Sequence, residues 1–132
     1  MKRCFMLFAV LASFSIFAQE PTKFFMVVKA RAFAKALETH TQAGDGVLLD
    51  VRKPNEFQEG HIEGAQNIDF YSETFKDDLD ELDRNKTYLV YCRSGGRSGR
   101  TSDLMKKMGF QRVYDLRGGI IAWKAGKQKV IQ

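Results

Sequence analysis

A cysteine stands where a predicted strand meets a predicted helix, and its neighbours are of the kinds that make a thiol reactive. Residues 92–98 read Cys-Arg-Ser-Gly-Gly-Arg-Ser. Paired glycines let the backbone curl so that N–H groups point inward, and such a nest at a helix N-terminus attracts an anion. The Cys92 thiolate could be that anion, because positive surroundings lower a thiol's pKa from about 8.5 to roughly 3.5–7.5. With Arg93 and Arg97 adding positive charge, the motif predicts an activated cysteine in an anion-binding loop.

The elements on either side place this cysteine at the edge of a sheet. Residues 87–91, Thr-Tyr-Leu-Val-Tyr, form an apolar run typical of a buried strand. The apolar side chains within residues 99–108 recur at i, i+3, i+4 and i+7, which predicts a helix. Open α/β sheets carry their chemistry at the carboxyl ends of strands, where Cys92 would lie. The alternative is a buried structural cysteine, but two arginines and two glycines are poor neighbours for a core thiol.

Residues 92–98 resemble the active-site loop of the rhodanese-like sulfurtransferases. The resemblance extends to residues 50–52, Asp-Val-Arg, and continues through the stretch from Glu56 to Ile68. Near the end of the chain the matching positions are Gly109, Val113, Leu116, Gly118, Gly119 and Trp123. The resemblance covers about residues 27–123 and implies an α/β fold, a small five-stranded parallel sheet with helices on both faces.

The resemblance also implies a reaction that passes through a covalent intermediate. Cys92 would take a sulfane sulfur from thiosulfate or a persulfide, and a thiol or cyanide would accept it from the Cys92 persulfide. The implied partners are a small anionic sulfur donor and this acceptor, and no metal or other cofactor is required. The implied substrate contacts are Arg93, Ser94, Gly95, Gly96, Arg97 and Ser98. The residues expected to support the loops beneath the site are Asp50, Arg52, Glu56 and His61.

Several other functions could use a similar cysteine. A cysteine phosphatase or arsenate reductase closes its cysteine loop with an arginine, but only four residues separate Cys92 from Arg97, one fewer than in those enzymes. A non-catalytic rhodanese-like binding module would usually lack the cysteine, and a sulfur-carrier module of the same family is a further alternative. A thiol oxidoreductase would need a Cys-x-x-Cys pair, which the sequence does not contain. His61 could be a general base, but a single histidine without a placed partner is weak evidence for that role.

Strands and helices alternate along the rest of the chain, which predicts a parallel sheet. Further short strands are expected at 27–28, 47–49, 66–68 and 113–114. Helices are expected from residue 29 to a turn at 43–46, from Pro54, over 72–83 and at 120–123, followed by a polar tail at 124–132. No linker or repeat interrupts this order, so residues 19–132 are expected to form one domain.

The N-terminal residues 1–18 have the pattern of a secretory signal peptide. A short basic start precedes an almost wholly apolar run, and Ala18 offers a small residue at the cleavage point. A membrane anchor is less favoured, because the run is shorter than the roughly 20 residues that a spanning helix needs. We therefore expect a periplasmic or secreted protein without a stable membrane anchor.

Cleavage would also change the charge and the cysteine count. Loss of Lys2 and Arg3, with no acidic residue, lowers the formal net charge from +5 to +3. This dispersed charge is too mild to indicate nucleic-acid binding. Loss of Cys4 leaves Cys92 as the single thiol, so the mature domain could form no internal disulfide. We also expect a monomer.

Overall fold

Five parallel strands form one sheet in the part of the chain that the structure describes. The computed structural model describes residue 15 and residues 22–132, so the predicted signal peptide lies outside it except for Ser15 and stays a prediction. The strand order is β1-β5-β4-β2-β3. The strands are β1 (Phe24–Val28), β2 (Gly46–Asp50), β3 (Gln66–Asn67), β4 (Thr87–Tyr91) and β5 (Arg112–Leu116). The predicted fold class is confirmed.

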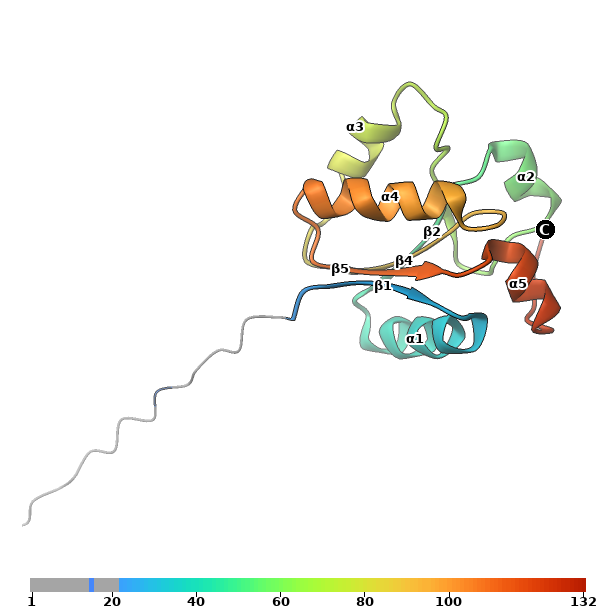
Figure 1. Cartoon of the computed structure of the whole chain (residues 1–132), viewed down its shortest axis with the longest axis horizontal. Helices are drawn as coiled ribbons and strands as arrows, with labels where there is room; N and C mark the ends of the chain where they lie inside the picture. The colour runs from blue at the N-terminus through green and yellow to red at the C-terminus, as the bar shows by residue number, and fades with distance from the viewer. Residues whose placement is uncertain (1–14, 16–21) are drawn as a thin grey trace, which may run out of the picture.

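Helices cover both faces of this sheet, and other, short helices lie at one end of it. They are α1 (Ala30–Ala43), α2 (Pro54–Glu59), α3 (Phe75–Asp80), α4 (Gly96–Lys107) and α5 (Gly119–Ala125). In Figure 1, α3 and α4 lie on one side of the sheet and α1 on the other. The short helices α2 and α5 lie at the end toward which the strands point. None of the described helices is long and apolar enough to cross a membrane.

Alternating side chains of the strands build two apolar clusters, one on each face. Leu49 and Val90 point into the cluster under α3 and α4, which also holds Met105. Their chain neighbours Leu48 and Leu89 point into the opposite cluster, with residues of α1 and α5. Strand β4 is buried along its whole length, as its apolar sequence predicts. The core thus fixes the position of the strand that leads directly to the cysteine.

Several boundaries differ from the sequence prediction. Strand β1 begins at Phe24, earlier than the predicted 27–28, where it pairs with β5. Helix α3 is shorter than the predicted 72–83. A turn precedes it, and the guanidinium of Arg84 donates to the carbonyls of Asp80, its last residue, and of Leu82 beyond it. Helix α4 begins at Gly96 instead of Gly99. Residues 96–98 are therefore the first turn of a helix and not part of a loop.

The predicted polar tail folds back onto the domain. Helix α5 runs on to Ala125, past the predicted end at Trp123. Beyond it, Val130 packs against the cluster of α1 and α5. Ile131 pairs with His61 as an antiparallel bridge, with both N···O distances at 2.8 Å. The apolar contacts of Val130 and the backbone pairing of Ile131 hold this segment against the domain.

Candidate active site

Cys92 follows the last residue of the central strand β4, at the carboxyl edge of the sheet. Only 1% of the surface of Cys92 is exposed to solvent. The chain leaves β4 through a tight loop that ends at Gly95, the residue before α4, whose φ of 109° is a left-handed conformation that favours glycine. Gly96, the first residue of α4, has no such conformation, so the turn requires only Gly95 to be glycine.

Hydrogen-bond donors surround the sulfur of Cys92. The N–H of Gly95 donates to Sγ at 3.1 Å, and the Ser98 hydroxyl lies 3.5 Å from Sγ. Burial raises the pKa of Cys92, but the Ser98 hydroxyl and the N–H groups of Ser98, Gly95 and Ser94 outweigh it and hold the pKa below its usual value. This lowering of the Cys92 pKa agrees with the sequence prediction. The groups that lower it are the N–H and O–H donors of residues 94–98, whereas the prediction also expected a contribution from the arginines.

Helix α5 fixes the direction of the peptide groups in this loop. Its first turn donates two hydrogen bonds, from the N–H of Ile120 to the carbonyl of Cys92 at 2.9 Å and from the N–H of Ile121 to the carbonyl of Arg93 at 3.2 Å. In a trans peptide the N–H points away from the C=O. No described peptide bond is cis, so holding the Arg93 carbonyl against α5 turns the N–H of Ser94 toward the opposite side.

A glycine allows α5 to come this close. Gly119 has a φ of 59°, and a Cβ at this position would overlap the carbonyl of Arg93 and the carbonyl oxygen of Cys92. Gly119 matched the family pattern in the sequence, but only the structure reveals this contact. The prediction assigned it no role in the site.

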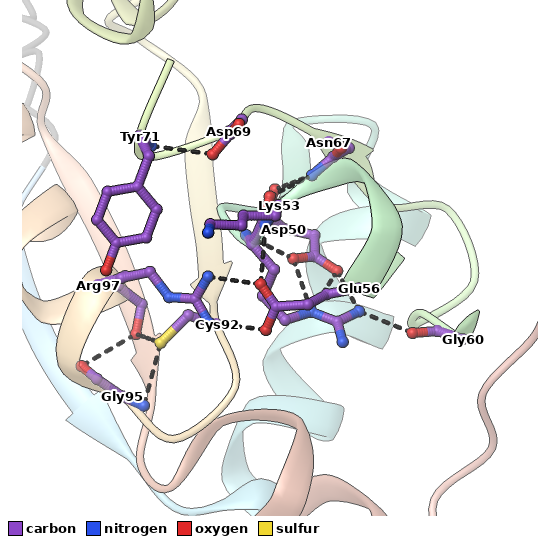
Figure 2. A network of polar contacts seen from close by, with 12 residues as sticks. Asp50, Lys53, Glu56, Gly60, Asn67, Asp69, Tyr71, Cys92, Gly95 and Arg97 are labelled. Atoms are coloured by element: carbon purple, nitrogen blue, oxygen red, sulfur yellow. Dashed lines mark hydrogen bonds and ion pairs between the residues drawn. The ribbon is translucent and has the colours of Figure 1, made fainter. Parts of the chain in front are cut away.

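The guanidinium of Arg97 is engaged by the carboxylate of Glu56. It donates to both oxygens of Glu56, at 2.7 and 2.9 Å, as Figure 2 shows. These bonds lower the pKa of Glu56 to about 2, against the opposing effect of burial. The pair links the first turn of α4 to α2. The ring of exposed Tyr71 lies beside it, 5.8 Å from Cζ of Arg97 and 5.3 Å from Nζ of Lys53.

Asp50 and Arg52 form a buried ion pair beneath α2. Nη2 of Arg52 donates to Asp50 at 2.7 Å and also to the carbonyl of Gly60 at 2.7 Å. Asn67 donates to the carbonyls of both residues, at 3.0 and 2.9 Å. Figure 2 shows this network lying on the far side of Glu56 from Cys92. It ties the end of β2 to the end of α2 and so supports the helix that carries Glu56.

His61 makes contacts that are local and structural. Its ring stacks on Phe57, with centroids 3.7 Å apart, and its Nδ1 is 2.9 Å from the Phe57 carbonyl. Its backbone pairs with Ile131. These partners fit the structural role that the sequence favoured over general-base catalysis.

The predicted site residues therefore fall into two groups. Ser94, Gly95 and Ser98 surround the sulfur with donors, and Arg93 is exposed on the loop. Glu56, Arg97, Asp50, Arg52 and His61 lie around α2 and its contacts with α4. Sequence reasoning missed Tyr71, Lys53 and the first turn of α5. No group of His, Cys, Asp and Glu within the described ranges could hold a metal ion.

Comparison with known proteins gives consistent matches. Residues 33–126 match the family model of the rhodanese-like domain. The chain is 42% identical over 82 residues to YqhL of Bacillus subtilis, covering 62% of this chain and 63% of YqhL, which is less than two thirds of that relative. It is 34% identical over 91 residues to the thiosulfate sulfurtransferase GlpE of Pseudomonas putida, covering 69% of this chain and 80% of GlpE.

A solved structure matches over most of the described part of the chain. The crystal structure of a rhodanese-related protein from Thermoplasma volcanium superposes with a TM-score of 0.68 at 25% identity, covering 81% of this chain and 98% of that one. The sequence and structural comparisons thus point to the same family.

Proposed function

The chain belongs to the family of rhodanese-like domains, and on that premise we propose that it is a sulfurtransferase that carries a sulfane sulfur on Cys92. The observation that carries the proposal is the setting of the Cys92 sulfur. It lies at the carboxyl end of β4, accepts an N–H from Gly95 at 3.1 Å, and has a lowered pKa. A thiolate is the nucleophilic form of cysteine, so this setting favours attack on sulfur.

The proposed first step loads the cysteine. The Cys92 thiolate attacks the outer sulfur of thiosulfate, a new S–S bond forms, and the donor's S–S bond breaks so that sulfite leaves with the electron pair. The product is a persulfide anion on Cys92. The N–H groups that now surround Sγ, from Ser94, Gly95 and Ser98, are the donors available to stabilise the added negative charge.

The proposed second step unloads it. A thiolate or cyanide attacks the outer sulfur of the persulfide, and the Cys92 thiolate leaves and is restored. The same donors stabilise the leaving thiolate, so one set of groups serves both steps. A persulfide could replace thiosulfate as donor by the same exchange of S–S bonds.

Of the two arginines, we propose that Arg93 binds the anionic donor. Arg97 is engaged by Glu56 through two hydrogen bonds. Arg93 is exposed and makes no ion pair with any other described residue. Its charge is therefore available to thiosulfate or sulfite at the mouth of the loop.

Intact mass spectrometry of the mature protein tests the proposal directly. Incubation with thiosulfate should add one sulfur atom, and later addition of cyanide should remove it and release thiocyanate. Cys92→Ser should gain no sulfur and should lose transfer activity to background, because a hydroxyl does not form a persulfide here.

Two outcomes would overturn it. A folded wild-type protein that never gains sulfur from thiosulfate, a persulfide or a polysulfide would favour a binding module. Efficient hydrolysis of aryl phosphates would favour a cysteine phosphatase, which we do not expect from a loop with four residues between Cys92 and Arg97.

A further inference from the structure

Strand β1 forms one edge of the sheet, and its composition leaves that edge open. In the part of the chain that the structure describes it pairs only with β5, whereas the opposite edge strand, β3, is two residues long. Natural edge strands are commonly protected by short length, by charged side chains or by proline, because an open edge can pair with another chain. The five residues of β1, Phe-Phe-Met-Val-Val, have none of these protections.

The free backbone groups of β1 belong to Phe25 and Val27. The N–H of Phe24 donates to the residue before β5 at 2.9 Å, and the carbonyl of Val28 accepts from the residue after β5 at 2.8 Å. Backbone groups of successive residues in a strand point to opposite sides, so those of Phe25 and Val27 face away from β5. No backbone group of the described loops and helices bonds to them. This edge therefore offers two N–H donors and two carbonyl acceptors at the spacing of a strand.

A hollow flanks β1 on each face of the sheet. In Figure 1, β1 runs between α4 above it and α1 below it. On the α4 side, Phe25 and Lys106 line a hollow of about 430 Å³, and on the α1 side, Met26 and Lys35 line one of about 320 Å³. Met26 is 48% exposed and Val27 is 55% exposed, and neighbouring side chains in a strand point to opposite faces. The side chains of an added strand would therefore alternate between the two hollows.

The residues with a permanent charge that flank β1 or line its hollows are all lysines. Exposed Lys23 and Lys29 stand directly before and after the strand. Lys106, whose Nζ lies 5.6 Å from the ring centre of Phe25, and Lys35 belong to the hollows. No acidic residue of the described chain lines either hollow. An occupant with carboxylate side chains would be complementary to this edge.

A second copy of this chain is a poor occupant of the edge. Two copies related by a twofold axis would pair their β1 strands antiparallel. In the register that lets Phe25 of one copy bond to Val27 of the other, Lys23 lies opposite Lys29, and like charges directly opposite each other are destabilising. The same repulsion favours a foreign strand that carries carboxylates at these two positions.

We propose that the outer edge of β1 binds an extended segment of another protein as a sixth strand, with acidic side chains opposite Lys23 and Lys29 and apolar side chains between them. Phe25 and Val27 supply the backbone hydrogen bonds, and the two hollows receive alternate side chains. The site is separate from Cys92, which follows β4, two strands away in the sheet. Binding at β1 does not depend on the proposed sulfur transfer.

The direct test titrates the protein with a blocked peptide, acetyl-Glu-Val-Thr-Val-Thr-Val-Glu-amide. Its order of side chains is the same in both directions, so it suits a parallel or an antiparallel pairing. Amide NMR should show shifts at Phe25 and Val27 and in the linings of the two hollows, and these two amides should become protected from hydrogen exchange. A matched peptide with lysine in place of both glutamates should bind at least about tenfold more weakly.

An exchange of charges separates this contact from non-specific adhesion. Lys23→Glu combined with Lys29→Glu should weaken binding of the glutamate peptide at least about tenfold and should allow the lysine peptide to bind. The matched control is Lys76→Glu combined with Lys124→Glu, which makes the same change in net charge outside β1 and its hollows. It should leave the affinities for both peptides unchanged. Equal binding of the two peptides to the wild-type protein would overturn the proposal.

Val27→Pro tests the backbone contact. The N–H of Val27 faces away from β5, so proline removes a donor to the added strand without removing a bond within the sheet, and edge strands tolerate proline. The variant should lose binding of the glutamate peptide, whereas Val27→Thr, which keeps the N–H, should retain it. Unchanged binding by folded Val27→Pro would contradict strand addition.

Two further results would overturn the proposal. One is the absence of shifts at β1 with either peptide. The other is a concentration-dependent dimer whose Phe25 and Val27 amides are protected without peptide, which would assign the edge to a second copy. Sulfur loading of Cys92 should be the same in all of these variants, so this proposal and the proposed function fail separately.

Discussion

At the scale of single residues, the two arginines of the loop differ in their partners. Arg97 donates to both oxygens of Glu56, whereas Arg93 makes no ion pair with the other described residues. The sequence places both next to the cysteine and cannot tell them apart, because Glu56 lies 41 positions away along the chain. Only the contact between Glu56 of α2 and Arg97 of α4 distinguishes the two arginines.

We predict that the two arginines respond differently to substitution. Arg93→Ala should raise the KM for thiosulfate by up to about fivefold with kcat little changed, since an exposed charge contact contributes up to roughly 1 kcal/mol. Arg97→Ala should also lower the stability of the fold, because it leaves Glu56 without its partner. Steady-state kinetics measure the change in KM, and thermal unfolding measures the stability of both variants. An equal loss of stability in Arg93→Ala and Arg97→Ala would contradict a structural role for Arg97 alone.

At the scale of elements, a large part of the site could be predicted. The strand before Cys92 and the helix after it follow from hydrophobic periodicity, and the glycines of the loop indicate the turn that places an N–H against the Cys92 sulfur. The predicted start of α4 was wrong by three residues. Hydrophobic periodicity cannot detect a first turn made of polar residues such as Arg97 and Ser98. The contact of α5 with the loop is non-local, and no pattern within the residues of either segment encodes it.

We predict that Gly119→Ala will damage the loop. The new methyl group would overlap the backbone of Arg93, in a conformation that costs a non-glycine residue about 1–3 kcal/mol. We expect α5 to move from the loop, which would free the carbonyls of Cys92 and Arg93 and raise the pKa of the thiol. Sulfur loading should therefore fall in protein that is still folded.

The matched control lies at the other end of the same helix. A Cβ on Gly126 would make ordinary contacts of 3.5 Å or more, and its φ of −79° suits any residue. Gly126→Ala should change stability by no more than about 0.5 kcal/mol and leave loading intact. Circular dichroism and intact mass measure the two effects. Wild-type loading by Gly119→Ala would show that the loop does not depend on α5.

At the scale of the whole molecule, the cellular location remains a proposal from the sequence. We propose export of the protein, on the strength of the basic start, the apolar run and Ala18. N-terminal sequencing of protein isolated from its native cells should begin near Gln19. A soluble cytoplasmic form that retains Met1 would contradict export.

The pairing of the last residues with His61 has a practical consequence for handling the protein. Ile131 bonds to the backbone of His61, and Gln132 donates to the carbonyl of Glu59, the last residue of α2. An affinity tag or a surface linker attached to Gln132 would therefore begin at the helix that carries Glu56. We would place such attachments elsewhere, because a tag at this position could disturb the contacts of Ile131 and Gln132 with His61 and Glu59 and so displace α2.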